Sequence, residues 1–203
     1  MLQEILIILL SFMTLSIAQC PIEFATLDQI CECQDRNTII CPNPSVNPRH
    51  EVILNSYPNY VWFGCRSKAK IDNYISEISL NDVIQSIIFD DCDLPNESYT
   101  QWLSSMNVTI SKLVLNNLPA KPLNPKLFEN LKIQRLVLQG IKSENIQNEE
   151  LFMYLSRLTH LKISGKQSQN IELPSNLFNG LTLLEFLSIR IPTGELFLHI
   201  HKV

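Results

Sequence analysis

An apolar template recurs five times along this chain of 203 residues. Each copy has the form apolar-x-x-apolar-x-apolar, and successive copies start 23 to 26 residues apart. A weaker copy, at residues 58–63, lies 26 residues before the first of them. Repetition at a nearly constant period of this length is the sequence signature of a solenoid, whose coils stack along a single core. The five clear copies start at Ile84, Ile110, Ile133, Leu158 and Leu184.

The apolar-x-apolar core of each copy predicts a short strand, because alternate side chains of a strand point to the same face. Such a strand buries about three side chains and is unstable alone, so it must stack on its neighbours. Between the strands, three segments carry apolar residues at i, i+1 and i+4, which predicts a short helix or helical turn on the return path. Each of these segments contains one phenylalanine, and we expect the three rings to stack in a column: Phe128, Phe152 and Phe178.

The N-terminal 18 residues predict a secretory signal peptide. An apolar run from Ile5 to Ala18 ends in small residues at positions −3 and −1, which fits cleavage before Gln19. As a helix this run would be about 21 Å long, short of the roughly 30 Å of a bilayer core. Glu4 precedes it without any Lys or Arg, which leaves a buried N-terminal helix as the alternative. No later segment has 18 uninterrupted apolar residues, so we expect a secreted, extracellular chain without a stable membrane span in its mature form.

The chain has six cysteines, whose meaning depends on this compartment. Four of them lie within residues 20–41, and such close spacing in a secreted chain predicts a small disulfide-stapled module. Zinc is the alternative for Cys31 and Cys33, but a C-x-C spacing lacks the two-residue gap of zinc knuckles and has no partnered histidine nearby. Spacing alone permits three pairings of the four. For Cys65 and Cys92, a disulfide and two free buried thiols both remain open.

Residues 173–189, with the sequence LPSNLFNGLTLLEFLSI, resemble the extracellular class of leucine-rich repeats. The cysteine cluster resembles the N-terminal cap of secreted and receptor-type members. The resemblance covers about residues 20–191. In this arrangement of cap and repeats, the chain is similar to Toll-type receptor ectodomains and to small secreted arthropod repeat proteins. The resemblance implies an α/β solenoid, a right-handed superhelix with a curved parallel sheet on its concave face. The implied division is a signal peptide (1–18), a cap (19–57) and repeats (58–203), five clear and one degenerate, without a C-terminal cap. The implied cap disulfides are Cys20–Cys33 and Cys31–Cys41.

Two features depart from the leucine-rich-repeat pattern. The family usually places asparagine after each strand, where its side chain satisfies backbone groups of adjacent turns. This chain has no cysteine cap after residue 191, and an uncapped end would expose a strand edge open to self-association. We interpret the sequence as a truncated product or fragment, with a natural dimerising end as the alternative. In this chain the positions after the strands hold Cys92, Leu118, Ile141, Lys166 and Pro192. A continuous row of buried asparagine side chains between the coils is therefore poorly supported.

The x positions of the predicted strands form the candidate binding surface. The resemblance places them on the concave face of the solenoid, where they display side chains to a partner. One column carries β-branched apolar residues, which predict an apolar binding strip, although strands in general favour such residues. Cationic positions lie beside this strip, while Asp90 and Asp91 give the other end an acidic character. The predicted contact residues are Ile88, Val114, Val137, Arg135, His160, Lys162 and Arg190.

Two sequons, at Asn96 and Asn107, have no proline in the middle and predict N-glycosylation of a secreted chain. Both lie outside the predicted strands, where a glycan would not disturb packing. A mobility shift of the secreted chain after glycosidase treatment is the expected result.

Charge and motifs exclude several classes of function. With 16 basic and 20 acidic residues, the chain offers no general attraction to nucleic acid or an anionic membrane. The four histidines are scattered and no catalytic, phosphate-binding or metal-binding motif is present, so we expect no enzyme activity, cofactor or metal. The predicted function is a secreted leucine-rich-repeat module that binds a protein or glycan partner. The alternatives are a non-catalytic accessory subunit of a secreted enzyme complex and a truncated receptor ectodomain.

Overall fold

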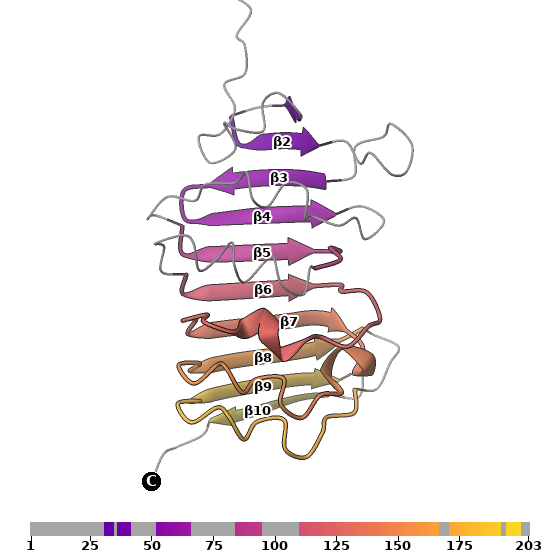
Figure 1. Cartoon of the computed structure of the whole chain (residues 1–203), viewed down its shortest axis with the longest axis vertical. Coiled ribbons are helices and arrows are strands. Elements are labelled where there is room, and N and C mark those ends of the chain that lie inside the picture. The colour runs from indigo at the N-terminus through magenta and orange to yellow at the C-terminus, as the bar shows by residue number, and fades with distance from the viewer. Residues whose placement is uncertain are drawn as a thin grey trace, which may run out of the picture.

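Ten strands form one continuous ladder in the described part of the computed structural model (Figure 1). They follow one another in chain order from β1 to β10. The structure describes residues 31–34, 36–41, 52–65, 84–94, 110–166, 171–191 and 194–199. The strands are β1 (Glu32–Cys33), β2 (Thr38–Cys41), β3 (Val52–Tyr57), β4 (Tyr60–Cys65), β5 (Ser86–Asp90), β6 (Lys112–Asn116), β7 (Arg135–Ile141), β8 (His160–Gly165), β9 (Phe186–Ile191) and β10 (Gly194–His199).

The direction of each strand follows from the length of the connection before it. Strands β1 to β4 pair antiparallel, and β10 pairs antiparallel with β9. Only two residues separate β3 from β4 and β9 from β10, so both pairs must be hairpins. Strands β4 to β9 are parallel, because the much longer connections between them let the chain return to the same end. The antiparallel β10 differs from the repeats expected up to residue 203.

Equivalent positions of the repeat template lie side by side in the parallel strands. Ile87 on β5 pairs with Leu113 on β6, and Leu113 pairs with Leu136 on β7. The weak copy joins the same register, because Val61 on β4 pairs with Ile87. All the inward residues are buried, so the strands predicted from the apolar template are confirmed and the described chain is a β-solenoid. These inward residues are Val61, Phe63, Ile87, Phe89, Leu113, Leu115, Leu136, Leu138, Leu161, Ile163, Leu187 and Ile189.

Three successive coils turn through the left-handed backbone region at the same point. Asp91, Asn117 and Gly140 directly follow in-register residues of β5, β6 and β7, and their φ angles are 57°, 51° and 61°. Asp, Asn and Gly are the residue types that tolerate this conformation best. Asn117 donates its backbone N–H to the Gln139 carbonyl of the next coil at 2.8 Å, so the turn also joins adjacent coils.

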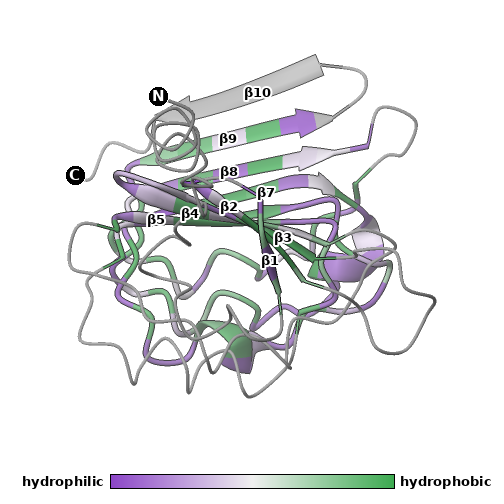
Figure 2. Ribbon diagram, turned by 90° about the horizontal axis from the view of Figure 1, so that it is seen from above, coloured by the Kyte–Doolittle hydropathy of each residue, from purple (hydrophilic) through white to green (hydrophobic). Residues whose placement is uncertain are grey.

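The return segments lie on the other side of the core from the sheet and turn apolar residues inward (Figure 2). We expected a short helix or a helical turn in these segments, and the described return segments contain only two 3-10 turns, η3 (Pro125–Phe128) and η4 (Ser143–Ile146). The expectation of an α/β solenoid is therefore corrected: the described chain has almost no helix. The reason is length, because a helix nucleus is costly and each segment ends after about one turn. In η3, the Asn124 side chain accepts a hydrogen bond from Lys126 N at 3.0 Å, and the chain is extended again at Glu129.

The predicted phenylalanine column is present. The ring centroid of Phe152 lies 6.2 Å from that of Phe128 and 6.5 Å from that of Phe178. Phe128 and Phe152 are completely buried, so the column belongs to the return side of the core. At the other end of the sheet, Phe63 and Phe89 stack with centroids 4.7 Å apart.

Two disulfides join described cysteines. Cys31 is bonded to Cys41, which is the second cap pair implied by the leucine-rich-repeat resemblance. Cys65 at the end of β4 is bonded to Cys92 after β5, so the structure has a disulfide where the sequence left free thiols as the alternative. Cys33 is also disulfide-bonded, but Cys20, its partner in the implied pairing, lies outside the described residues.

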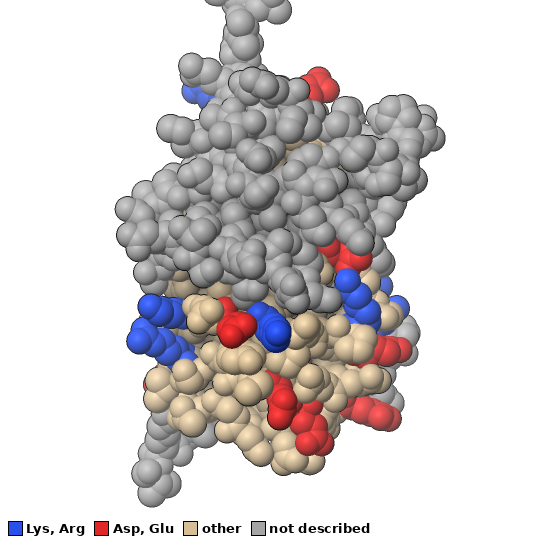
Figure 3. Space-filling view, in the orientation of Figure 1, with Lys and Arg blue, Asp and Glu red and all other residues tan. Residues whose placement is uncertain are grey.

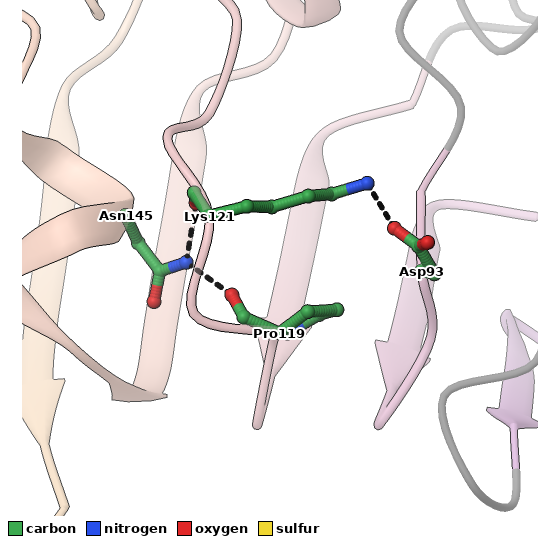
Figure 4. Close-up of polar contacts among 4 residues, drawn as sticks. All are labelled: Asp93, Pro119, Lys121 and Asn145. Atoms are coloured by element: carbon green, nitrogen blue, oxygen red, sulfur yellow. Dashed lines mark hydrogen bonds and ion pairs between the residues drawn. The ribbon is translucent and has the colours of Figure 1, made fainter.

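Asn145 supplies a buried polar link between coils that the sequence analysis did not foresee (Figure 4). Its side-chain amide donates to the carbonyls of Pro119 at 2.6 Å and Lys121 at 2.9 Å, one coil earlier. Its Oδ1 accepts from Lys142 N at 2.9 Å. Asn145 is itself 1% exposed, so its amide is shielded from water and depends on these protein partners for its hydrogen bonds. An asparagine therefore hydrogen-bonds the backbone of the adjacent coil here, four residues beyond the position at which the leucine-rich-repeat pattern places it.

Several predictions concern residues outside the described ranges. These are the signal peptide (1–18) and the sequons at Asn96 and Asn107. In the described part of the chain, no helix has the length and apolar character needed to cross a membrane.

Candidate functional site: the outer face of the sheet

The candidate site is the face of strands β4 to β9 that points away from the core, which we call the outer face. Because strands alternate, every second residue belongs to it, and the parallel register arranges these residues in three rows. The first row is Tyr60, Ser86, Lys112, Arg135, His160 and Phe186. The middle row is Trp62, Ile88, Val114, Val137, Lys162 and Ser188. The third row is Gly64, Asp90, Asn116, Gln139, Ser164 and Arg190.

All seven predicted contact residues lie on this outer face. Four consecutive members of the middle row, Trp62, Ile88, Val114 and Val137, form what we call the apolar row. Trp62, Ile88 and Val137 are half-buried and present part of their surface. Val114 is only 7% exposed, so its neighbours cover it and it offers little surface to a partner.

Trp62 is a site residue that the sequence analysis missed. The weak repeat copy at residues 58–63 is recognisable by its inward residues, and the apolar template does not mark the positions between them. Strand alternation carried the signal, because Val61 and Phe63 point inward and Trp62 must then point outward. Its register partner on β5 is Ile88, so the tryptophan extends the apolar row by one strand.

Aromatic side chains gather at this end of the outer face. The rings of Tyr57 and Tyr60 stack across the β3–β4 hairpin with centroids 4.4 Å apart and planes 18° apart. The six-membered ring of Trp62 lies over Gly64, since a Cβ placed there would be 2.6 Å from Cζ3 and 2.7 Å from Cζ2 of the indole. A glycine inside a strand commonly marks such a close approach. The aromatic surface is thus held against the sheet by local geometry.

Positive side chains occupy the next part of the outer face. Lys112 and Arg135 are direct neighbours in the first row, on adjacent strands β6 and β7. Lys162 follows Val137 in the middle row, and both Arg135 and Lys162 are exposed. We call Lys112, Arg135 and Lys162 the cationic group.

Other polar residues of the outer face lie toward its two ends. The His160 ring lies 5.7 Å from the ring of Phe186, and its Nδ1 is 2.9 Å from Thr159 Oγ1. Arg190 is exposed in the third row at β9. At the other end, Asp90 accepts a hydrogen bond from Asn117 Nδ2 at 3.0 Å.

Charges on the return side are arranged differently. Figure 3 shows this side, with lysine, arginine and acidic side chains interspersed over the described surface. One ion pair there joins Lys121 to Asp93, shown in Figure 4. Asp93, three residues after Asp90, thus pairs with a residue of the return path. On the outer face, by contrast, the described rows of β6 to β8 hold cations and no carboxylate.

Comparison with known proteins gives a fold likeness. No protein-family model matches the chain, and no curated protein matches it. A chain in the solved structure of the Toll–Spatzle complex, described as a molecular hub in Drosophila development and innate immunity, aligns with a TM-score of 0.54 and 21% sequence identity. The alignment covers 77% of the present chain and 21% of the other, so this chain spans about a fifth of that chain's length. At this identity the likeness supports the solenoid fold.

Proposed function

We propose that this chain is a secreted leucine-rich-repeat module that binds a protein partner through the outer face of its sheet. The observation that carries the proposal is the apolar row, in which Trp62, Ile88 and Val137 lie in register on an exposed sheet face. Rows of partly exposed aromatic and aliphatic side chains are typical of protein interfaces, where tryptophan and tyrosine supply much of the binding energy. A rigid parallel sheet loses little conformational entropy when a partner binds.

Three further observations support the finer parts of this proposal. The repeat period and the stacked parallel strands agree with a leucine-rich repeat whose described return segments consist of turns, two of them 3-10 turns. Disulfides form and persist in oxidising compartments, which agrees with a signal peptide and secretion. The fold likeness is to a chain from a structure of a complex between proteins, by its title. In this proposal the chain acts by recognition and catalyses no reaction, and Asn96 and Asn107 carry glycans.

Site-specific photo-cross-linking tests the outer face directly. A benzophenone amino acid replaces Val137 on the outer face or, as the control, Met153 on the return side, where the methionine is 48% exposed. Each secreted chain is exposed to extracellular fluid of the source organism, and the cross-linked proteins are identified by mass spectrometry. A discrete protein captured at position 137 and absent at position 153 supports the proposal. Equal capture at both positions overturns it.

The partner captured in this way is then purified and its affinity measured. Ile88→Asp and Val137→Asp place a charge in the apolar row at half-buried positions, so we expect each to weaken binding by at least about tenfold. Val114 is unsuitable for this purpose, because an aspartate at a nearly buried position would disturb the fold itself. Circular dichroism and urea denaturation check that the variants remain folded. Unchanged affinity in both folded variants contradicts binding through the outer face.

A further inference from the structure

The cationic group is arranged in a way that the isolated sheet does not favour. Lys112 and Arg135 are direct register partners on β6 and β7, and neighbouring strands are about 4.8 Å apart. Like charges directly opposite each other destabilise a sheet. No ion pair joins either side chain, or Lys162, to another residue in the described ranges. Their charges are therefore available to an anionic partner.

General basicity does not explain these cations. The chain carries a formal net charge of −4, and both positive and negative side chains occur on the described return surface (Figure 3). A local positive patch on an acidic chain selects for a partner that brings negative charge to that place. The patch therefore indicates the sign of the partner's surface.

The position of the apolar row indicates the class of the partner. Lys162 directly follows Val137 in the middle row, and Arg135 lies two residues before Val137 on the same face of β7. A sulfated polysaccharide would use the cations and leave the apolar row in contact with water. A protein segment with carboxylates beside apolar side chains would cover both. The continuity of the two features thus favours protein over polyanion.

We propose that the partner presents an acidic, apolar protein segment, whose carboxylates bind Lys112, Arg135 and Lys162 while its apolar side chains cover Trp62, Ile88 and Val137. This inference rests on the proposed function and adds the chemistry of the partner. The contact crosses the strands from β4 to β8, a distance of about 19 Å at the usual strand spacing. About six residues of extended chain span that distance. The segment lies with its acidic part over β6 to β8 and its apolar part toward β4.

Peptide selection on the intact secreted chain tests this chemistry without a known partner. Randomised 12-residue peptides displayed on phage are selected at 0.15 M salt on the wild-type chain, and the enriched peptides are synthesised for calorimetry. We expect sequences that combine Asp or Glu with Leu, Ile, Phe or Tyr. Lys112→Glu/Arg135→Glu should weaken their binding by tenfold or more, on the order seen for truncated interfacial charge pairs. The matched control, Lys126→Glu/Lys132→Glu, makes the same change of net charge at exposed return-side positions and should leave the affinity unchanged.

Each contrary result has a distinct meaning. Recovery of no acidic sequences, or equal loss in the two charge-reversed chains, overturns the inference. Heparin oligosaccharide is a second probe. If heparin binding requires Lys112 and Arg135, is unaffected by Val137→Asp and is not displaced by any selected peptide, the partner is a polyanion. That result also overturns the inference. Failure of the proposed function looks different. If the cross-linked partner is sensitive to Val137→Asp but not to charge reversal, the proposed function stands and the acidic segment fails; insensitivity to both removes the proposed function.

Discussion

The indole of Trp62 lies over Gly64, two residues further along the same face of β4. The contact is so close that a Cβ at position 64 would be 2.6 Å from Cζ3 of the ring. The missing side chain of Gly64 therefore provides the place where the indole rests against the sheet. An aromatic surface fixed in this way loses little freedom on binding, which favours its use as the fixed end of the apolar row.

Replacing Gly64 with alanine should displace the Trp62 ring. The atoms that a methyl group would meet belong to the far end of the indole, which can rotate away, so we expect the sheet to survive with stability changed by no more than about 1 kcal/mol. In a Trp102→Phe background, Trp62 is the only fluorophore of its kind, since the chain has two tryptophans. Its emission should shift to longer wavelength and its quenching by iodide should increase. Ser86→Ala, on the same face of the next strand, is the control and should change neither signal.

Asn145→Ala should reveal how much the buried amide link contributes. The substitution removes the Asn145 partner of the Lys121 carbonyl and of the Lys142 N–H, while the Pro119 carbonyl keeps its hydrogen bond from Lys121 N at 2.8 Å. A buried polar group left unsatisfied costs about 1–3 kcal/mol, so we expect a loss of about 2–3 kcal/mol in the free energy of unfolding. Asn176 hydrogen-bonds only at an exposed position, and Asn176→Ala should remain within about 0.5 kcal/mol of wild type. Equal losses in urea denaturation of the two variants would contradict the structural role of Asn145.

Phe152→Ala should be the most damaging change in the phenylalanine column. The ring is completely buried between Phe128 and Phe178, and removal of such a side chain costs about 3–5 kcal/mol. Phe178 has one described phenylalanine neighbour and is only partly buried, so Phe178→Ala should cost clearly less. Thermal and urea unfolding of both variants measure the difference. A reversed order would mean that the column does not close the return side of the core.

Loss of the Cys65–Cys92 disulfide should lower the free energy of unfolding, because the unfolded chain gains conformational entropy without the bridge. The bridge closes a loop with a sequence separation of 27, and the chain-entropy relation gives about 3.5 kcal/mol for a loop of this length. Cys65→Ala/Cys92→Ala should lose about this much free energy of unfolding. Cys92→Ala alone breaks the same bridge and should lose nearly as much. A double variant within 1 kcal/mol of wild type would show that other contacts already restrain the loop.

The strands could be predicted because their signal is local and periodic. Inward residues such as Leu113 and Leu136 define both the strand and its register, since stacked repeats must bury equivalent positions side by side. The return path could not be predicted as well. Its apolar spacing fits either a helix or a succession of turns, and the choice depends on how many residues remain between the last buried side chain and the next strand.

The exposed residues of the outer face can be predicted only where the repeat template is strong. Ile88 and Val137 lie on strands that match the template, whereas Trp62 lies in the weak copy. Asn145 escaped for a different reason: its partners are backbone carbonyls of the preceding coil, which no side-chain pattern reveals. The pairing of Cys65 with Cys92 likewise depended on the distance between two coils, which spacing along the chain leaves open.

Reversal of one charge in the cationic group should separate stability from binding. Arg135 lies between Lys112 and His160 in the first row. In Arg135→Glu, the positively charged neighbour of Lys112 becomes a negatively charged one. Cross-strand pairs of this kind are worth about 0.2–1 kcal/mol, and we expect the isolated chain to become more stable by about that amount. The gain should largely disappear at 1 M salt, because exposed charges are then screened. Gln139→Glu, exposed on the same strand between Asn116 and Ser164, has no cation as register partner and should show no such gain. If the Arg135→Glu variant is more stable and binds the selected peptides less tightly, Arg135 contributes to binding at the expense of stability. If the variant is less stable, Arg135 stabilises the sheet.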